Sequence, residues 1–480
     1  MSALRRSLLF SFAEKYLLLL LATLGSMVLA RALTPAEIGV YSVAAVLVGM
    51  AQVVRDFGVG QYLIQEKELT PDKLRAALGA SLLVAWPLAA LLVLLAPALA
   101  GFYHQPALRA VLQLLALNVA LVPYSAVALP LLRRRMRFAA IFSINLTHSL
   151  AQLGCSVALA LLGFGALSLA CGALAGTLAA TCASLCCRPA GAALWPGRRG
   201  IAAVLRFGAY STAGGLVDEA GVAAPELVIG RMIGVAEVGI FGKANGLLGL
   251  FNQAVTSAVS PVVFPLYAAR ARGGLDAKQA YLTTVAYITA LAWPFFGFVG
   301  VMADALLDLL YGPQWRAAAP LIRVMCFSSA FYSMFSMARY LLVALGQVKA
   351  QAGLDAAAVP VRVAALLLAA PFGLYWVAWA VVLGALYRGW LTYRCLARLA
   401  GLRWGELLLA VARSAPLAAL SCAGAALARH WPALPDGPAR LALAGAAALL
   451  LWLLGIGLLR HPLAAEFALA RRRAWALLVK

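Results

Sequence analysis

The chain has 480 residues, of which 64% are hydrophobic and only 12% are charged, and its mean hydropathy is +0.92. A water-soluble protein needs far more polar surface, so this composition excludes one and indicates a polytopic membrane protein. The formal net charge of +22 would suggest nucleic-acid binding in a soluble chain. Membrane proteins instead collect Lys and Arg in their cytoplasmic loops, which explains the excess here.

The hydropathy pattern predicts an all-α integral membrane protein with about 14 transmembrane helices, each of roughly 20 apolar residues. The first segment is basic and then apolar, with no small-residue cleavage site after it, so it is interpreted as a spanning helix and not as a signal peptide. In chain order the expected spans are residues 8–31, 38–57, 76–100, 108–130, 139–162, 164–187, 205–229, 238–266, 280–302, 317–345, 353–371, 374–397, 405–427 and 440–459.

The distribution of basic residues predicts the orientation of these spans. An even number of spans returns both termini to one side, and the loops and termini on that side hold roughly 28 Lys and Arg, against roughly 6 on the other. We therefore expect cytoplasmic N- and C-termini, with the residues after the last span, from Arg460 onward, forming a basic cytoplasmic tail. The outer loops are short, which leaves no outer domain to hold an active site.

A motif near the start of the chain is repeated 200 residues later. Residues 29–45 read LARALTPAEIGVYSVAA, and residues 229–245 read IGRMIGVAEVGIFGKAN. The repeated positions include Arg31 and Arg231, Glu37 and Glu237, and Gly39 and Gly239. A repeat in the same sense predicts two pseudo-symmetric lobes related by an axis along the membrane normal. The expected domains are an N-lobe of six helices over residues 1–200, a C-lobe of six helices over 201–400, and two further helices with the basic tail over 401–480.

The chain offers no pattern typical of a cofactor site. Its eight cysteines fall in or beside apolar segments without metal-ligand spacing to its four histidines, so they are interpreted as small apolar residues. We find no nucleotide-binding loop and no paired nucleophile and base. The sequence therefore predicts no enzyme activity, no metal and no cofactor. Because no nucleotide-binding loop is found, the expected source of energy is a proton gradient, a sodium gradient or the membrane potential.

Several stretches together resemble one transporter family. They are residues 30–39 (ARALTPAEIG), 56–65 (DFGVGQYLIQ), 130–138 (PLLRRRMRF), 229–244, 259–267 (VSPVVFPLY) and 309–315 (LLYGPQW) with Ala319 and Pro320. In this order they resemble the polysaccharide transporters, or Wzx-type flippases, of the multidrug/oligosaccharidyl-lipid/polysaccharide (MOP) exporter superfamily. The likeness covers residues 1–345, and the last 130 residues contribute only compatible hydropathy. One departure is Glu226, where related sequences tend to have Asp.

The resemblance implies a function in polysaccharide assembly. A flippase of this family moves lipid-linked oligosaccharides of the undecaprenyl-pyrophosphate type from the cytoplasmic to the outer leaflet of the bacterial inner membrane, for exopolysaccharide, O-antigen or capsule. Two lobes rock about a central cavity, because a sugar-pyrophosphate head group cannot cross hydrocarbon unaided. Implied partners are the lipid-linked oligosaccharide, a polysaccharide polymerase and chain-length proteins, with no nucleic acid.

Two alternatives remain open. A multidrug and toxic compound antiporter of the same superfamily shares the plan of two lobes, although its usual twelve helices and acidic cation site fit this basic chain less well. A membrane polymerase or ligase acting on the same lipid-linked sugars would generally show a long outer loop or a catalytic acid motif, and this chain has neither.

Five basic side chains near helix ends are candidates for binding the pyrophosphate. Snorkelling to the membrane surface explains any one of them, but as a set from both lobes they could line the cavity. They are Lys15, Arg55, Lys243, Arg323 and Arg339.

Asp218 and Glu219 lie near the middle of the predicted seventh span, where a carboxylate costs several kcal/mol unless it is paired or hydrated. They are either the ion-coupling site or a structural pair with a base of the same lobe. For the repeat, an ion pair of Arg31 with Glu37, and of Arg231 with Glu237, is expected to pin each helical hairpin. The basic residues 133–137 are expected to anchor the chain to anionic membrane lipids.

Overall fold

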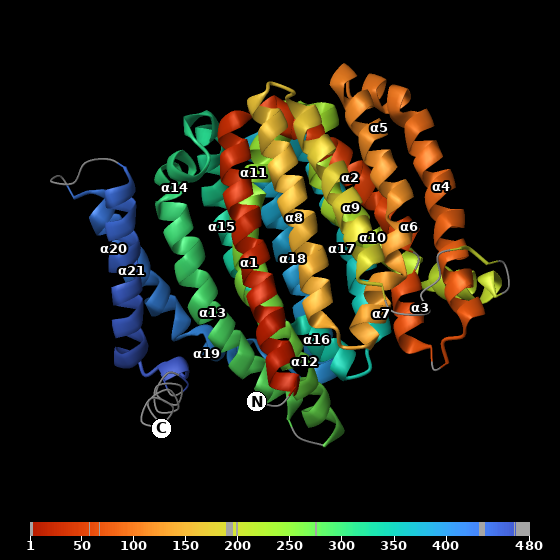
Figure 1. The fold of residues 1–480 in the computed structure, drawn as a ribbon. Coiled ribbons are helices and arrows are strands. Elements are labelled where there is room, and N and C mark those ends of the chain that lie inside the picture. The colour runs from red at the N-terminus through yellow and green to blue at the C-terminus, as the bar shows by residue number, and fades with distance from the viewer. Residues whose placement is uncertain are drawn as a thin grey trace. The chain divides into compact units, whose positions relative to one another are not determined.

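The computed structural model describes residues 3–56, 58–66, 68–188, 195–197, 200–273, 276–431, 437–464 and 466. Its regular structure is helical throughout these residues, which confirms the all-α fold (Figure 1). Most of the basic tail expected from Arg460 onward lies outside the described residues.

Thirteen helical stretches of the described chain are long and apolar enough to cross a membrane. The long helix α10 (Ile201–Met232) is not among them, because Asp218 and Glu219 lower its hydropathy, but its 32 residues are more than a bilayer requires. With α10 added, the described helices agree with the fourteen spans expected from sequence. The protein is a multi-pass membrane protein.

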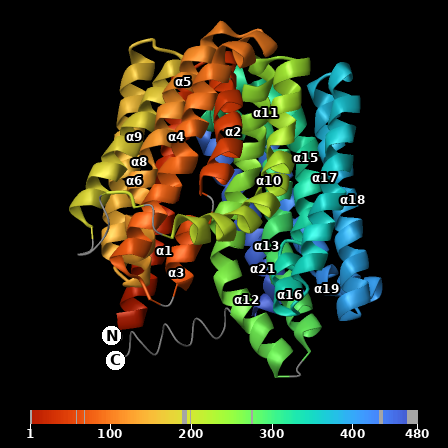
Figure 2. The same ribbon diagram turned by 90° about the vertical axis from the view of Figure 1, so that its right-hand side faces the viewer.

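The chain folds as two compact units, Met1–Gly242 and Lys243–Lys480. The expected lobe boundary at residue 200 describes the repeat in the sequence and stays a prediction. The division by packing falls later in the chain, because α10 packs against α2 (Pro35–Asp56) and α4 (Pro71–Phe102) of the first unit. Figure 2 shows α10 beside α2.

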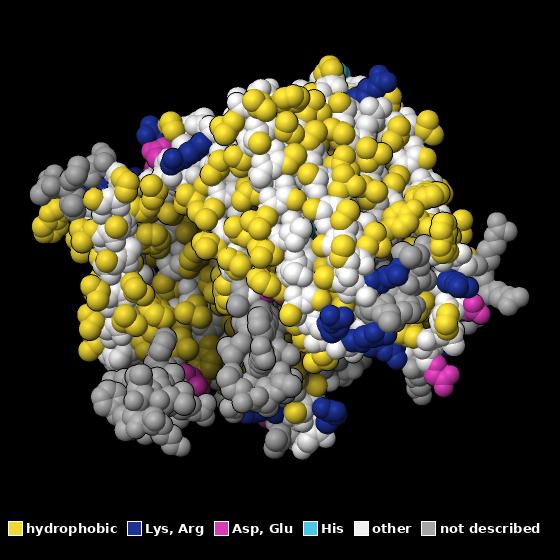
Figure 3. Space-filling model, viewed as in Figure 1, with side chains coloured by type: hydrophobic (Ala, Val, Ile, Leu, Met, Phe, Trp, Pro, Cys, Tyr) yellow, Lys and Arg dark blue, Asp and Glu magenta, His cyan; other side chains and the backbone are white. Residues whose placement is uncertain are grey.

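In the first unit, α2 is surrounded by α4, α5, α9 and α10, and α1 packs on the outside against α8 (Figure 1). The remaining helices of this unit are α1 (Ala3–Ala32), α3 (Val59–Gln65), α5 (Pro106–Leu121), α6 (Pro123–Ala126), α7 (Ala128–Arg134), α8 (Phe138–Leu161) and α9 (Ala166–Cys186). On the face drawn in Figure 3, hydrophobic side chains cover α1 and α8, while Lys and Arg gather near α7. An apolar band with basic ends is the surface that a bilayer requires.

In the second unit, α13 (Ala277–Val301) is the central helix and contacts α12, α15, α19 and α20. Figure 2 shows α17 and α18 packed side by side, and α20 pairs with α21. Helix α11 (Val235–Phe251) begins in the first unit and continues into the second. The other elements of the second unit are η1 (Asn252–Thr256), α12 (Ser257–Arg272), α14 (Ala303–Leu310), η2 (Pro313–Ala318), α15 (Ala319–Ser333), α16 (Ala338–Ala344), α17 (Val348–Ala369), η3 (Ala370–Phe372), α18 (Leu374–Ala400), α19 (Trp404–Val411), α20 (Ser414–Arg429) and α21 (Pro438–Leu458).

At one break within a predicted span, a side chain of a neighbouring helix hydrogen-bonds to the backbone. The span expected at residues 317–345 is interrupted between α15 and α16, which frees carbonyl groups from helical bonding. The fully buried Tyr281 of α13 donates its hydroxyl hydrogen to the carbonyl oxygen of Met334 at 2.8 Å. An irregular backbone at membrane depth is tolerated only where the surrounding protein satisfies it in this way.

Candidate functional site

The two copies of the repeated motif meet at their glycines. A Cβ atom placed on Gly39 would lie 1.6 Å from the carbonyl oxygen of Val235, and one placed on Gly239 would lie 2.1 Å from that of Pro35. Residues 35 and 235 occupy the same place in the repeat, so the contact is reciprocal. This reciprocity indicates a local two-fold relation between the motif copies, and only glycine permits so close a contact between the backbones.

Glu37 of the first motif copy serves as a helix cap. Thr34 donates both its backbone N–H and its hydroxyl hydrogen to Oε2 of Glu37, each at 2.8 Å, and the N–H of Glu37 donates to Oγ1 of Thr34 at 3.3 Å. This is a capping box at the start of α2. In the second copy, Oε2 of Glu237 turns back toward Gly234, within 2.5 Å of where a Cβ would lie.

The arginines of the motif lie in exposed positions at the ends of their helices. The guanidinium of Arg231 stacks on the ring of Phe102, 4.9 Å from its centroid. Burial raises the pKa of the neighbouring Tyr103 above its ordinary value, and the charge of Arg231 partly opposes that shift. The predicted ion pairs of Arg31 with Glu37 and of Arg231 with Glu237 stay predictions.

Arg55 lies at the end of α2 in a pocket of about 550 Å³ within the first unit, which we call the Arg55 pocket. Its side chain is 9% exposed, and Nε and Nη2 donate to Oδ1 of Asp56 at 3.0 and 2.7 Å. The left-handed Gly58 (φ +62°) then turns the chain from α2 into α3, which keeps these two residues at the pocket. Ser81, Ser125 and Arg133 also line it. Two guanidiniums and one carboxylate give this lining a surplus of positive charge.

The basic run at residues 133–137 is partly explained by local structure. Arg133 contributes to the Arg55 pocket. Arg134 donates to the carbonyl oxygens of Leu63, at 3.2 Å, and of Glu66, and so bonds the end of α3. The run therefore stabilises the wall of the pocket in addition to its predicted contact with lipid.

Lys243 belongs to an aromatic cluster in the second unit. Its Nζ lies 4.8 Å from the ring centroid of Tyr311 and 5.5 Å from that of Trp315, and both rings are buried. Stacking of an ammonium group on aromatic faces stabilises the cation. These rings come from the LLYGPQW stretch, so that motif positions Lys243.

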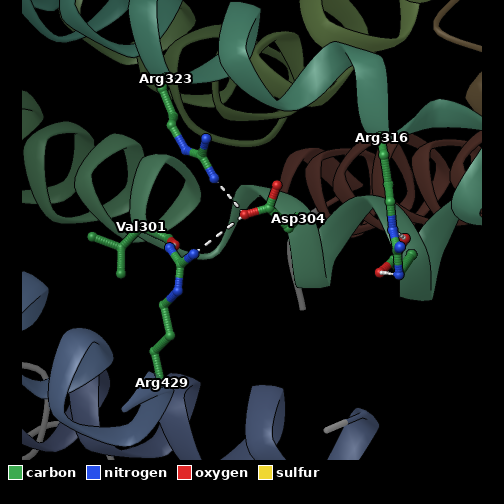
Figure 4. Close-up of polar contacts among 6 residues, drawn as sticks. Val301, Asp304, Arg316, Arg323 and Arg429 are labelled. Atoms are coloured by element: carbon green, nitrogen blue, oxygen red, sulfur yellow. Dashed lines mark hydrogen bonds and ion pairs between the residues drawn. The ribbon is translucent and has the colours of Figure 1, made fainter.

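Arg323 and Arg339, the other candidates of the second unit, lie on different helices. Arg323 of α15 forms an ion pair with Asp304 of α14, whose carboxylate also meets Nη2 of Arg429 at 3.4 Å (Figure 4). Arg323 also lines an apolar groove between α13, α15 and α20. Arg339 is exposed on α16. The structure therefore places them in separate surroundings within this unit.

Lys15, Asp218 and Glu219 are all half-buried in the first unit. Lys15 lies on α1, which packs at the edge of the unit against α8. Glu219 turns toward α2, where its Oε1 lies 3.2 Å from the position of a Cβ on Gly49. Adjacent residues on a helix point about 100° apart, so Asp218 faces elsewhere. The roles of these residues in binding and coupling stay predictions.

An ion pair in the second unit joins a buried carboxylate to a half-buried guanidinium, and neither residue is among the sites predicted from the sequence. Nη2 of Arg388 on α18 meets Oδ1 of Asp355 on α17 at 2.5 Å, and Nε2 of Gln351 donates to Oδ2 of that carboxylate at 2.9 Å. The Arg388 guanidinium also lies 5.7 Å from the ring centroid of Tyr332. Arg388 lies within α18, inside the span expected over residues 374–397. An acid inside an apolar span, the criterion that selected Asp218, would also have selected Asp355.

Comparison with known proteins identifies the family. The family model for "Polysaccharide biosynthesis protein" matches residues 28–320, more than half of the chain. The succinoglycan biosynthesis transport protein ExoT of Rhizobium meliloti is 26% identical over 303 residues, which are 63% of this chain and 61% of ExoT. The teichuronic acid biosynthesis protein TuaB of Bacillus subtilis is 24% identical over 289 residues, 57% of each chain. The chain thus spans about three fifths of the length of these relatives.

A solved structure shares the whole fold. The lipid II flippase MurJ, in an inward closed conformation, superposes with a TM-score of 0.74 over 95% of this chain and 100% of its own, at 12% identity. At that identity the likeness shows a common fold. The family match and this fold together confirm the resemblance that the sequence motifs carry. The chain belongs to the polysaccharide biosynthesis protein family.

Proposed function

We propose that the protein is a flippase that moves a lipid-linked oligosaccharide from the cytoplasmic to the outer leaflet of the bacterial inner membrane, with both of its termini in the cytoplasm. The proposal is supported by the match to the polysaccharide biosynthesis family, by relatives named for succinoglycan transport and for teichuronic acid biosynthesis, and by the fold shared with a lipid II flippase. The orientation follows from the excess of basic residues in the inner loops.

The observation that carries the proposal is the Arg55 pocket. A pyrophosphate head group needs cationic donors in a recess, and guanidinium groups bind phosphate through two parallel hydrogen bonds. Arg55 is buried at the inner end of its span and Arg133 lines the same pocket, which offers two such groups. Asp56 is 68% exposed, so it can move away as the phosphate takes its place on Arg55.

The substrate then crosses by alternating access. The pyrophosphate is neutralised by protein cations, the sugars stay in a hydrated cavity, and the lipid chain remains in the bilayer, so the head group never meets hydrocarbon. Energy comes from a proton gradient, a sodium gradient or the membrane potential, with Asp218 or Glu219 as the coupling group. The buried pair of Asp355 and Arg388 is a second candidate for coupling, because a carboxylate at membrane depth is rarely without a role.

The sharpest test is flipping of a fluorescent lipid-linked oligosaccharide in vesicles that contain the purified full chain. Arg55→Gln removes the charge and keeps a polar side chain, and we expect it to slow flipping by tenfold or more. Arg316→Gln is the matched control, because Arg316 is exposed, bonds twice to Asp308 at 2.7 Å, and is not among the residues that line the Arg55 pocket. Equal flipping in both variants would reject the pyrophosphate site.

The same vesicles separate the alternatives. A drug antiporter would expel a cationic dye in exchange for ions and leave the lipid-linked sugar in place. A polymerase or ligase would lengthen or transfer the oligosaccharide, and chromatography of the recovered lipid would detect the change in mass. Flipping of an unaltered substrate supports transport without catalysis.

A further inference from the structure

A second cavity, in the other unit, is lined almost wholly by apolar groups. It measures about 450 Å³ and lies between α13, α15 and α20, where Trp293, Phe296, Phe327 and Cys422 line it, and Arg323 supplies a charge. We call it the Arg323 groove. Phe327 is 68% exposed, so the groove opens at the surface of the unit, where a membrane protein meets lipid.

The groove is confined to half of the membrane thickness. On α13 it runs from Trp293 to Val301, which at 1.5 Å per residue is about 12 Å. On α15 it runs from Arg323 to Ala330, about 10 Å. Since the hydrocarbon core is about 30 Å thick, the groove occupies the depth of one leaflet. By the proposed orientation this is the outer leaflet.

Among the residues that the structure describes, the charges beside the groove leave a positive surplus. The single carboxylate of Asp304 meets Arg323 from one side and Arg429 from the other (Figure 4). Arg429 also donates to the carbonyl oxygen of Val301, which lines the groove. Two guanidiniums therefore share one negative charge. Arg316, by contrast, is matched by the carboxylate of Asp308 through two bonds of 2.7 Å.

We propose that the Arg323 groove binds an anionic phospholipid of the bilayer, with an acyl chain in the groove and the phosphate on Arg323 and Arg429. A methylene group fills about the volume of a water molecule, ~30 Å³, so the groove holds roughly one acyl chain. A polyprenyl chain is several times too long for it. Charge complementarity selects an anionic head group, and the depth of the groove selects a lipid of that leaflet. This site is independent of the proposed flipping activity.

The test counts the lipids that the purified full chain retains in native mass spectrometry. The probes are phosphatidylglycerol and phosphatidylcholine with identical acyl chains, added at equal concentration. We expect one phosphatidylglycerol to be retained in preference, and Arg323→Gln to weaken its retention by roughly tenfold, as for the loss of a charged hydrogen bond. Arg316→Gln should leave it unchanged.

A second variant tests the apolar part of the Arg323 groove without changing any charge. Ala419→Trp adds bulk at an exposed position in the groove and leaves both arginines in place, so it should also lower retention of phosphatidylglycerol. Equal retention by the native chain, Arg323→Gln and Ala419→Trp would overturn the proposal. So would displacement of the bound phosphatidylglycerol by an equimolar polyprenyl phosphate, because that outcome assigns the groove to the transported lipid.

Discussion

Gly39 and Gly239 occupy equivalent positions in the two copies of the repeated motif, and their backbones pack directly against each other. A Cβ on either residue would come within 2.1 Å of a carbonyl oxygen on the opposite helix. The N-terminal ends of α2 and α11 therefore approach each other directly. Glu37 and Glu237, in the first turns of these helices, offset the partial positive charges that this contact brings together.

Substitution of either glycine should disrupt this contact. We expect Gly39→Ala and Gly239→Ala each to lower the midpoint of thermal unfolding of the purified chain by several degrees, because rigid backbone cannot yield to the added methyl group. Gly242→Ala in α11 is the control, since no atom lies within 4 Å of a Cβ placed there. That change should be neutral or slightly stabilising. Equal midpoints in all three variants would contradict the packing of the two motifs.

The ion pair of Asp355 and Arg388 should show strong coupling. Asp355→Leu alone leaves the Arg388 charge without this carboxylate. We expect it to lower the free energy of unfolding by about 2–3 kcal/mol. This loss is smaller than that for a fully buried pair because Arg388 is 29% exposed. The double variant Asp355→Leu with Arg388→Met should recover most of that loss. The exposed pair of Arg316 and Asp308 offers a comparison, and Arg316→Gln should cost less than about 1 kcal/mol. A double variant that loses the sum of the two single effects would refute the coupling.

His461 should make stability depend on pH. It is buried beyond the end of α21, where Nδ1 accepts the backbone N–H of Leu463 at 3.2 Å and Nε2 lies 3.5 Å from Oγ of Ser414. Burial, and then the charge of Arg413, hold the pKa of His461 below its ordinary value of 6.5. Because the pKa is lowered in the folded state, the unfolded chain binds the proton before the folded chain does as the pH falls. The stability that neutral His461 contributes is therefore fully present above pH 6.5 and is lost as the pH falls through the pKa of the folded state.

The measurement is the unfolding midpoint between pH 7.5 and pH 5, values that bracket roughly the ordinary histidine pKa. His461→Gln should flatten the decline, because the side chain no longer titrates. His104→Gln is the matched control, since His104 is exposed, and the decline should persist there. A decline of the same size in His461→Gln would assign the effect to other groups.

Asp218→Asn and Glu219→Gln test ion coupling in the flipping assay. Each keeps the size of the side chain and removes its charge. We expect at least one to abolish the dependence of flipping on an imposed gradient while the amount and folding of the protein persist. Full, gradient-dependent flipping in both variants would reassign the two residues to the structure of α10, with Glu219 packed against Gly49 of α2. Asp355→Asn would then be the next variant to test.

The sequence by itself determined the class of the protein and its family. Apolar segments of about 20 residues separated by basic loops permit little besides a bundle of membrane helices, because the backbone must satisfy its own hydrogen bonds in lipid. The repeat is recognisable in the sequence because its Arg, Glu and Gly residues recur at a constant separation. The candidate residues stand out in the sequence as charges in predominantly apolar segments, which are few enough in this chain to be noticed, and their roles stay predictions.

Only the tertiary structure decided what those charges contact. The partner of Arg323 is Asp304, 19 positions earlier in the chain, and the partner of Asp355 is Arg388, 33 positions later. No spacing rule connects such pairs, because helix rotation and tilt are set by packing against neighbours. For the same reason the sequence revealed Gly39 and Gly239 as equivalent, but could not show that they touch. Equivalent positions can be read from the linear sequence, whereas contact depends on how the folded helices pack against each other.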